Sequence, residues 1–306
     1  MILRTEGLSH RYTSSWAIHD IGIQIEGTGI IGLLGSNGAG KSTTMNIICG
    51  TLKPTEGNVY IDDIDLRKHP EEAKRKIGYL PQTLPLYTDL TVDEYLVYAA
   101  ELRLVAKDKI GSALREVKER CGITQVSSRL IRNLSGGYRQ RVGIAQSIIH
   151  RPRLIVMDEP TNGLDPNQLI EARKLIKEIA EEHTVLLSSH VLSEVNLLCK
   201  EIIMIESGRV VFSDSMESFN SYIQSKAVVV RMENPPSREE LFRIRGVAGV
   251  EYLTDKKLRI YFEGGSEITE KIISASVAGN WRLQEIHIDK GELDDIFKLI
   301  SQQTAK

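Results

Sequence analysis

The hydrophobic positions divide the first two thirds of the chain into short apolar runs separated by longer stretches with helical spacing. Runs short enough to be buried strands occupy residues 30–34, 77–80, 154–158 and 185–188. Helical spacing occurs in between, for example at residues 41–49 and 169–179. This alternation predicts an α/β domain in which helices cover a parallel sheet. Residues 17–26, where isoleucines alternate with smaller or polar residues, and residues 59–61 predict an antiparallel β layer beside it.

The pattern changes near residues 213–225, and the remaining tail is predicted to form a second, smaller domain. The expected strands are residues 227–232, 250–254, 258–262 and 282–288, and the expected helices are residues 237–245, 267–277 and 292–300. The order β-α-β-β-α-β with one added helix is that of a ferredoxin-like α+β unit. Fold alone does not assign its role, which is open between a folding or dimer-stabilising module and a regulatory ligand site.

Composition and charge argue against several classes of function. The chain has 306 residues, enough for two domains with a core each, and its formal net charge is -2. That charge provides no global cationic field, so we expect no nucleic-acid partner. The three cysteines, Cys49, Cys121 and Cys199, form no C-x-x-C pair, which favours reduced thiols over a disulfide or zinc framework. No apolar run approaches the roughly 18 residues of a membrane span, so a membrane role would require a separate partner chain.

One glycine-rich segment carries the strongest chemical signal. The run Gly35-Ser36-Asn37-Gly38-Ala39-Gly40-Lys41-Ser42-Thr43 fits the phosphate-binding pattern G-x-x-x-x-G-K-[ST] at every fixed position, between a predicted strand and a predicted helix. Its glycines let backbone N–H groups surround phosphate oxygens, and the helix N-terminus favours the same anion. Lys41 adds a positive charge, and Ser42 supplies a hydroxyl for Mg²⁺. The segment predicts a nucleoside triphosphate site.

Three further segments distinguish among the classes of P-loop protein. Residues 133–141, Asn-Leu-Ser-Gly-Gly-Tyr-Arg-Gln-Arg, resemble the signature motif of ATP-binding cassette (ABC) ATPases. Asp158 and Glu159 end an apolar strand as the family's Walker B and catalytic glutamate do, and His190 follows residues 184–189 as its switch histidine does. These motifs stand in the family's order, together with Tyr12, Gln82 and Gly163-Leu164-Asp165.

The resemblance to ABC ATPases covers residues 1–215 and implies a nucleotide-binding domain with a helical subdomain at about residues 83–150. Tyr138 stands where the signature usually ends in glutamine, whereas the serine and both glycines are intact, so we expect activity. The segment is similar to those of the A-type subfamily. The tail at residues 226–306, after a linker helix at 216–225, resembles the accessory domain of bacterial exporter ATPase subunits, including those assigned to gliding-motility systems.

The resemblance also implies a role for each motif, with ATP and Mg²⁺ as the cofactors. Asp158 would hold Mg²⁺ together with Ser42 and Gln82, Glu159 would be the general base, and Lys41 and His190 would contact the γ-phosphate. Tyr12 would stack on adenine, although a core tyrosine with Trp16 in that role is the alternative. Ser135, Gly136, Gly137 and Asp165 would complete a nucleotide site shared with a partner subunit. This implies a head-to-tail dimer of this chain, or of this chain with a paralogous ATPase, when ATP is bound.

We therefore expect the cytosolic ATPase subunit of a membrane transporter, an exporter, held at the inner face of the cell membrane by a separate transmembrane permease subunit. Residues 84–98, rich in leucine and tyrosine, are expected to dock that permease, or else to be core of the helical subdomain. An alternative function is a soluble ABC ATPase acting on nucleic acid or ribosomes. A P-loop kinase is a third reading, which the signature segment opposes.

Overall fold

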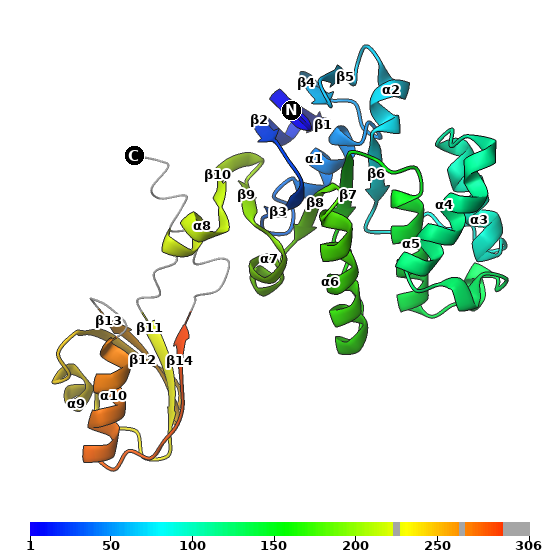
Figure 1. Ribbon diagram of the computed structural model, residues 1–306. Helices are drawn as coiled ribbons and strands as arrows, with labels where there is room; N and C mark the ends of the chain where they lie inside the picture. Colours follow the sequence, from blue (N-terminus) through cyan, green and yellow to red (C-terminus); the bar gives the residue numbers. More distant parts are fainter. Residues whose placement is uncertain (223–226, 263–266, 290–306) are drawn as a thin grey trace. The chain divides into compact units, whose positions relative to one another are not determined.

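The computed structural model describes residues 1–222, 227–262 and 267–289 of the chain (Figure 1). These residues form two compact units that divide between Glu217 and Ser218, two residues beyond the end predicted for the first domain. Each unit is described by itself. No helix in the described ranges is both long and apolar enough to cross a membrane.

The first unit is built on a six-stranded sheet with the order β10-β9-β3-β8-β7-β6. Its strands are β3 (Gly29–Leu34), β6 (Ile77–Leu80), β7 (Leu154–Asp158), β8 (Thr184–Ser189), β9 (Glu201–Glu206) and β10 (Arg209–Ser215). Strands β6, β7, β8, β3 and β9 are parallel, and β10 pairs antiparallel with β9. Every residue of β3, β7 and β8 is buried, as their continuous apolar runs predict for a parallel sheet covered on both faces.

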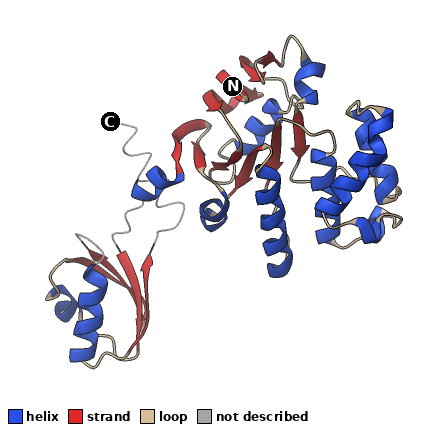
Figure 2. Ribbon diagram, viewed as in Figure 1, coloured by secondary structure: helices blue, strands red, loops and turns tan. Residues whose placement is uncertain are grey.

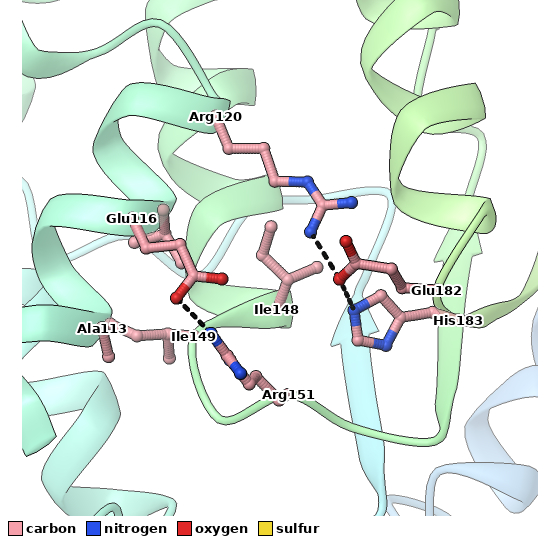
Figure 3. A pocket seen from close by; sticks show the side chains of 9 residues that line it. Ala113, Glu116, Arg120, Ile148, Ile149, Arg151, Glu182 and His183 are labelled. Atoms are coloured by element: carbon pink, nitrogen blue, oxygen red, sulfur yellow. Dashed lines mark hydrogen bonds and ion pairs between the residues drawn. The ribbon is translucent and has the colours of Figure 1, made fainter.

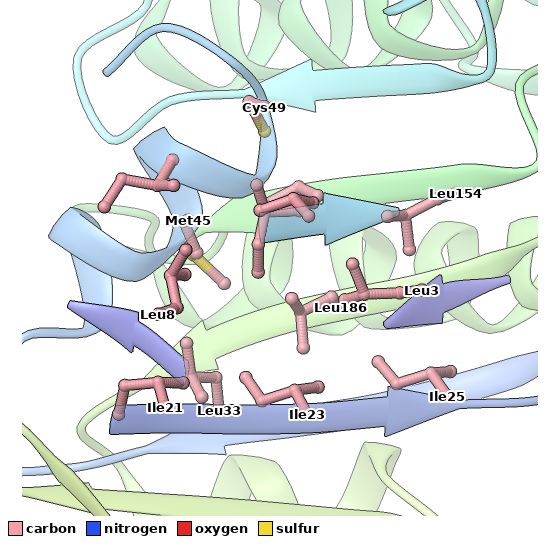
Figure 4. Close-up of a cluster of buried hydrophobic side chains, with 14 of the residues drawn as sticks. Leu3, Leu8, Ile21, Ile23, Ile25, Leu33, Met45, Cys49, Leu154 and Leu186 are labelled. Carbon is pink, nitrogen blue, oxygen red and sulfur yellow. The ribbon is translucent and has the colours of Figure 1, made fainter. Parts of the chain in front are cut away.

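The predicted antiparallel layer is a second, four-stranded sheet with the order β2-β1-β4-β5. Its strands are β1 (Leu3–Tyr12), β2 (Ser15–Ile25), β4 (Glu56–Ile61) and β5 (Ile64–Asp65). Strand β1 was not predicted, because register shifts interrupt its pairing with β2 and Gly7 has a φ of +56°. Side chains such as Leu3, Leu8 and Ile23 pack with Met45 and Leu186 in one buried cluster (Figure 4). This apolar contact holds the antiparallel sheet beside the P-loop helix.

In the described part of the first unit, helices surround or extend the six-stranded sheet. They are α1 (Lys41–Ile48), α2 (Pro70–Arg75), α3 (Val92–Leu102), α4 (Lys107–Arg120), α5 (Gly136–Ile148), α6 (Pro166–Ala180) and α7 (Leu192–Leu198). Helices α3, α4 and α5 gather in one lobe, with α5 nearest to β6 (Figure 1). Two 3-10 turns, at Thr124–Val126 and Ile131–Asn133, lead into α5. The three helices of the lobe lie within residues 83–150. Thr91 begins α3 with a capping box to Glu94.

The second unit has the predicted β-α-β-β-α-β order. Its elements are β11 (Ala227–Met232), α9 (Arg238–Phe242), β12 (Val247–Thr254), β13 (Lys257–Phe262), α10 (Glu267–Ala278) and β14 (Leu283–Asp289). The four strands form an antiparallel sheet with the order β12-β13-β11-β14, and both helices lie on one face of it (Figure 2). Helix α8 (Met216–Tyr222) stands between the two sheets in the chain, at the predicted linker. The helix predicted for residues 292–300 lies outside the described residues.

Candidate functional site

The parallel sheet brings three of the predicted site segments to one edge. Leu34, the last residue of β3, pairs with Ser189 of β8, and Asp158 of β7 pairs with Ser188. The P-loop, the Asp-Glu pair and His190 follow directly after these strand ends. Because parallel strands present their carboxyl ends at the same edge, segments more than 100 residues apart converge there.

The glycine-rich loop after β3 is shaped for an anion. Gly40, the N-cap of α1, has a φ of +109°, and a Cβ there would lie 2.6 Å from Ile18 Cγ2. No side chain caps α1 and its first turn holds no acid. Among the described residues, the N–H groups of Gly40, Lys41 and Ser42 have no hydrogen-bond acceptor. Unpaired donors at a helix N-terminus fit phosphate oxygens.

The residues of the loop divide into a buried base and an open rim. Gly35, Ala39, Gly40 and Lys41 are buried, Ser36 and Thr43 are half-buried, and Asn37, Gly38 and Ser42 are exposed. The Ser36 hydroxyl donates to Glu206 Oε2 at 3.0 Å, which ties the loop to the end of β9. The exposed Ser42 hydroxyl is therefore accessible to an ion, as its predicted role requires.

Lys41 is the cation of this edge. Its Nζ donates to the carbonyl oxygens of Gly35 (2.8 Å) and Ser36 (3.0 Å), and the residue is only 6% exposed. Burial lowers the pKa of Lys41, and the negative charges of Glu159, Asp158 and Glu206 oppose that shift. A desolvated ammonium with no ion-pair partner in the described residues interacts strongly with an incoming phosphate.

Glu159 contacts three polar side chains at this edge of the sheet, and these four residues are called the Glu159 cluster. Its Oε1 lies 2.9 Å from His190 Nδ1, and its Oε2 accepts from Asn162 Nδ2 at 3.2 Å and Gln82 Nε2 at 3.4 Å. Three predicted residues, Gln82, Glu159 and His190, are thus brought together. Asn162 was not predicted, although it stands next to the predicted Gly163-Leu164-Asp165 segment.

The neighbouring Asp158 has a separate environment. It is 4% exposed, and its Oδ1 accepts from Ser188 Oγ at 2.5 Å. The same hydroxyl oxygen accepts from the backbone N–H of Glu159 at 2.8 Å. Glu159 has a φ of +49°, a left-handed conformation that a bulky residue rarely adopts. Ser188 therefore holds the turn that directs the two carboxylates to different partners, a role the sequence did not reveal.

The signature residues lie at the N-terminus of α5. Ser135 is the N-cap, and its Oγ accepts from the Tyr138 N–H at 3.4 Å. Ser135, Gly137 and Tyr138 line a cavity of about 320 Å³, whose other lining residues include Gln125 and Gln168. The Tyr138 hydroxyl accepts from Gln125 Nε2 at 3.0 Å, so the tyrosine at the usual glutamine position is part of a hydrogen bond within the lobe.

Tyr12, Asp165 and the signature serine and glycines make no hydrogen bond or ion pair with the Glu159 cluster in the described parts of the chain. Asp165 Oδ1 instead accepts from the N–H groups of Asn167 (3.0 Å) and Gln168 (2.9 Å) as the N-cap of α6. Tyr12 and Trp16 are 51% and 41% exposed, so the reading of Tyr12 as a core residue is wrong. Both rings are accessible for stacking.

A second cavity lies between α4, the end of α5 and the end of α6 (Figure 3). Its volume of about 10 Å³ admits at most one water molecule and is too small for a nucleotide. The ion pairs Arg151–Glu116 and Arg120–Glu182 (3.2 Å) cross it. This cavity is therefore a small packing gap, and the two ion pairs join α4 to the segments that follow α5 and α6.

Comparisons with known proteins agree with this geometry. Residues 18–162 match the family model described as ABC transporter. The ABC transporter ATP-binding protein NatA of Bacillus subtilis (strain 168) is 37% identical over 204 residues, covering 66% of this chain and 83% of NatA. The bacitracin transport ATP-binding protein BcrA of Bacillus licheniformis is 32% identical over 316 residues, covering 99% of this chain and 98% of BcrA.

A solved structure shares the fold of the first unit. It is a dimer of the ATP-binding cassette MJ0796 bound to ADP and Pi, which is 25% identical, with a TM-score of 0.64, covering 70% of this chain and 99% of that chain. This chain therefore shares both fold and sequence with ATP-binding subunits of transporters. This chain belongs to the ABC transporter family, whose ATPases bind and hydrolyse ATP with Mg²⁺.

Proposed function

We propose that this chain is the cytosolic ATPase subunit of an exporter, held at the inner face of the membrane by a separate permease subunit. The name of BcrA, a relative matched over nearly its whole length, refers to bacitracin transport and supports this proposal. We also propose the domain limits 1–215, with a helical subdomain at about 83–150, then a linker at 216–225 and an accessory domain at 226–306. The meeting of Gln82, Glu159 and His190 beside Lys41 carries the catalytic part of the proposal.

The residues at the edge of the sheet have different roles in ATP hydrolysis. Mg²⁺, when bound, draws charge from the phosphate oxygens, and Ser42, Gln82 and Asp158 supply the hydroxyl, amide and carboxylate oxygens to hold it. The unpaired N–H groups of the P-loop and Lys41 bind and orient the phosphates. Glu159 orients a water and takes its proton. His190 contacts the γ-phosphate and, through Nδ1 at 2.9 Å from Glu159 Oε1, also holds that carboxylate in place. Tyr12 stacks on adenine.

A dimer completes the site in this proposal. Ser135 and Gly136 are exposed at the start of α5, and a Cβ on Gly136 would meet no atom within 4 Å. This open N-terminus suits the nucleotide of a second subunit, with Gly137 and the segment around Asp165 beside it. The partner is a second copy of this chain or a paralogous ATPase, and ATP lies between the P-loop of one and the signature of the other.

The permease docks on the face that follows Gln82. Tyr87 and Tyr98 are 55% and 39% exposed there, and their rings pack edge to face with 5.5 Å between the ring centroids. Tyr95 is buried, and Leu84, Leu86 and Leu90 are half-buried, so these four residues are mainly core of the lobe. The docking face is therefore narrower than the sequence suggests, and its exposed part is the tyrosine pair.

The test of the catalytic assignment is Glu159→Gln, compared with Glu116→Gln, which removes the α4 carboxylate that pairs with Arg151 away from the sheet edge. Loss of a general base typically lowers the rate by about 10²–10⁴-fold, so we expect phosphate release to fall at least about 100-fold while Mg²⁺-ATP binding persists. On size-exclusion chromatography with ATP, the variant should form a stable dimer. Turnover close to that of Glu116→Gln would refute the role of Glu159.

A further inference from the structure

A buried carboxylate that none of the motifs includes lies behind the catalytic edge. Glu194, in the first turn of α7, is 6% exposed. Its Oε2 accepts two hydroxyl hydrogen bonds, from Thr161 Oγ1 at 2.8 Å and from Ser189 Oγ at 3.2 Å. Its Oε1 accepts from Arg173 Nη2 of α6 at 3.1 Å. Helices α6 and α7 and both catalytic loops thus converge on one side chain.

The two hydroxyls come from the segments that carry the catalytic pair. Thr161 stands two residues after Glu159, in a turn closed by the Asn162 N–H to the Glu159 carbonyl at 3.1 Å. Ser189 stands directly before His190, and its Oγ also accepts from the Val191 N–H at 3.0 Å, which fixes the backbone on both sides of the histidine. A single carboxylate oxygen therefore links the turn that carries Glu159 to the turn that carries His190.

We propose that Glu194 is a positioning residue for hydrolysis, which sets the Glu159–His190 contact by holding Thr161 and Ser189 at a fixed separation. The proposal rests on the catalytic roles assigned above. The cost of burying a carboxylate is offset here by charge-assisted hydrogen bonds on both oxygens. Thr161 and Ser189 are themselves buried, at 8% and 3% exposure, so water cannot replace a lost bond easily. Loss of the Glu194 carboxylate therefore removes the link between the turn that carries Glu159 and the turn that carries His190.

Among the described residues, Glu194 makes no hydrogen bond or ion pair with the P-loop, so its effect should fall on turnover rather than on nucleotide binding. Because small misplacements of reacting groups cost up to about 100-fold in rate, we expect Glu194→Gln to lower kcat about 10–100-fold. The affinity for Mg²⁺-ATP, measured by equilibrium binding, should stay within about twofold of wild type. Thr161→Val and Ser189→Ala keep the Arg173–Glu194 pair and remove one hydroxyl each, so they should lower kcat by smaller factors.

The experiment measures kcat, ATP affinity and the unfolding midpoint for these variants, with Glu182→Gln as the control. Glu182→Gln also removes an arginine partner, that of Arg120, but touches neither catalytic loop. In an enzyme already carrying Glu159→Gln, adding Glu194→Gln should lower the residual rate by less than about twofold, because groups that act as a unit are not additive. A purely structural role would lower that residual rate by the same factor as in wild type.

Two results would overturn the proposal: wild-type kcat in both Thr161→Val and Ser189→Ala, or additive losses in the Glu159→Gln background. The hydroxyl variants keep the proposal testable if Glu194→Gln does not fold. Near-normal turnover of Glu159→Gln alone would instead overturn the catalytic assignment on which the proposal rests, so the two failures are distinguishable.

Discussion

Replacing Gly136 with alanine should stabilise the ATPase unit and yet impair its activity. Gly136 begins α5 with an ordinary negative φ, and an added Cβ would meet nothing within 4 Å. A glycine-to-alanine change in a compatible conformation stabilises by about 0.4–1 kcal/mol, mainly by reducing the entropy of the unfolded chain. For a unit of this size, that corresponds to a rise in Tm of about 1–4 °C.

The activity should move in the opposite direction if a second subunit presents its nucleotide to this helix N-terminus. The added methyl group would then occupy space needed by the γ-phosphate, and overpacking of a close contact costs about 1–3 kcal/mol. At about 1.4 kcal/mol per tenfold, the rate should fall about 5–150-fold. The isolated subunit has no such contact, so the added methyl group should not lower its free energy of unfolding.

Gly111→Ala is the matched control for this prediction. Gly111 lies within α4, is exposed, and an added Cβ there also meets nothing within 4 Å. That variant should gain about 1 kcal/mol and hydrolyse ATP at the wild-type rate. Thermal unfolding and steady-state phosphate release measure the two effects. Full activity of Gly136→Ala would refute the shared nucleotide site, and a lowered Tm would refute the reading that the space beside Gly136 is open.

The remaining predictions concern the dimer and the permease. Lys41→Ala and Ser135→Arg should each be inactive alone, but a mixture of the two variants should recover phosphate release. In a heterodimer, one nucleotide site contains both substitutions and the other contains neither. Activity of the mixture no greater than the sum of the separate variants would contradict this. Tyr87→Asp should abolish copurification with the membrane partner and leave basal ATPase nearly unchanged, whereas Leu197→Asp, an equally exposed change on α7, should still copurify. Retained copurification of Tyr87→Asp, or loss of its basal ATPase, would favour core packing of that face.

The sequence was sufficient for the parts of this protein that depend on local chemistry. A run such as Gly35 to Thr43 requires its glycines, lysine and serine at fixed spacing, because backbone N–H groups must surround a phosphate. The buried strands β3, β7 and β8 were predicted within about one residue, since a strand buried on both faces has a continuous apolar run. The ferredoxin-like order of the second unit followed in the same way from short alternating runs.

Other features depended on neighbours that the chain supplies from a distance. Strand β1 has an irregular pattern because its register shifts against β2, so periodicity did not reveal it. Tyr95 and Tyr98 are three residues apart on one helix, yet one is buried and the other exposed, because only packing decides which face is covered. Asp165 matches a nucleotide-site motif, while its carboxylate caps α6.

The side chains around Glu159 show most clearly which features the sequence predicts and which only the tertiary structure decides. The resemblance to ABC ATPases made Gln82, Glu159 and His190 candidates, because each stands in a motif that follows the family's order. Their meeting at 2.9–3.4 Å depends on the parallel pairing of β6, β7 and β8. The convergence of Thr161, Ser189 and Arg173 on Glu194 depends in addition on the packing of α6 and α7. A buried hydrogen bond between distant residues leaves no local pattern, since any of several polar side chains would satisfy the same spacing along the chain, and only the tertiary structure selects the partners.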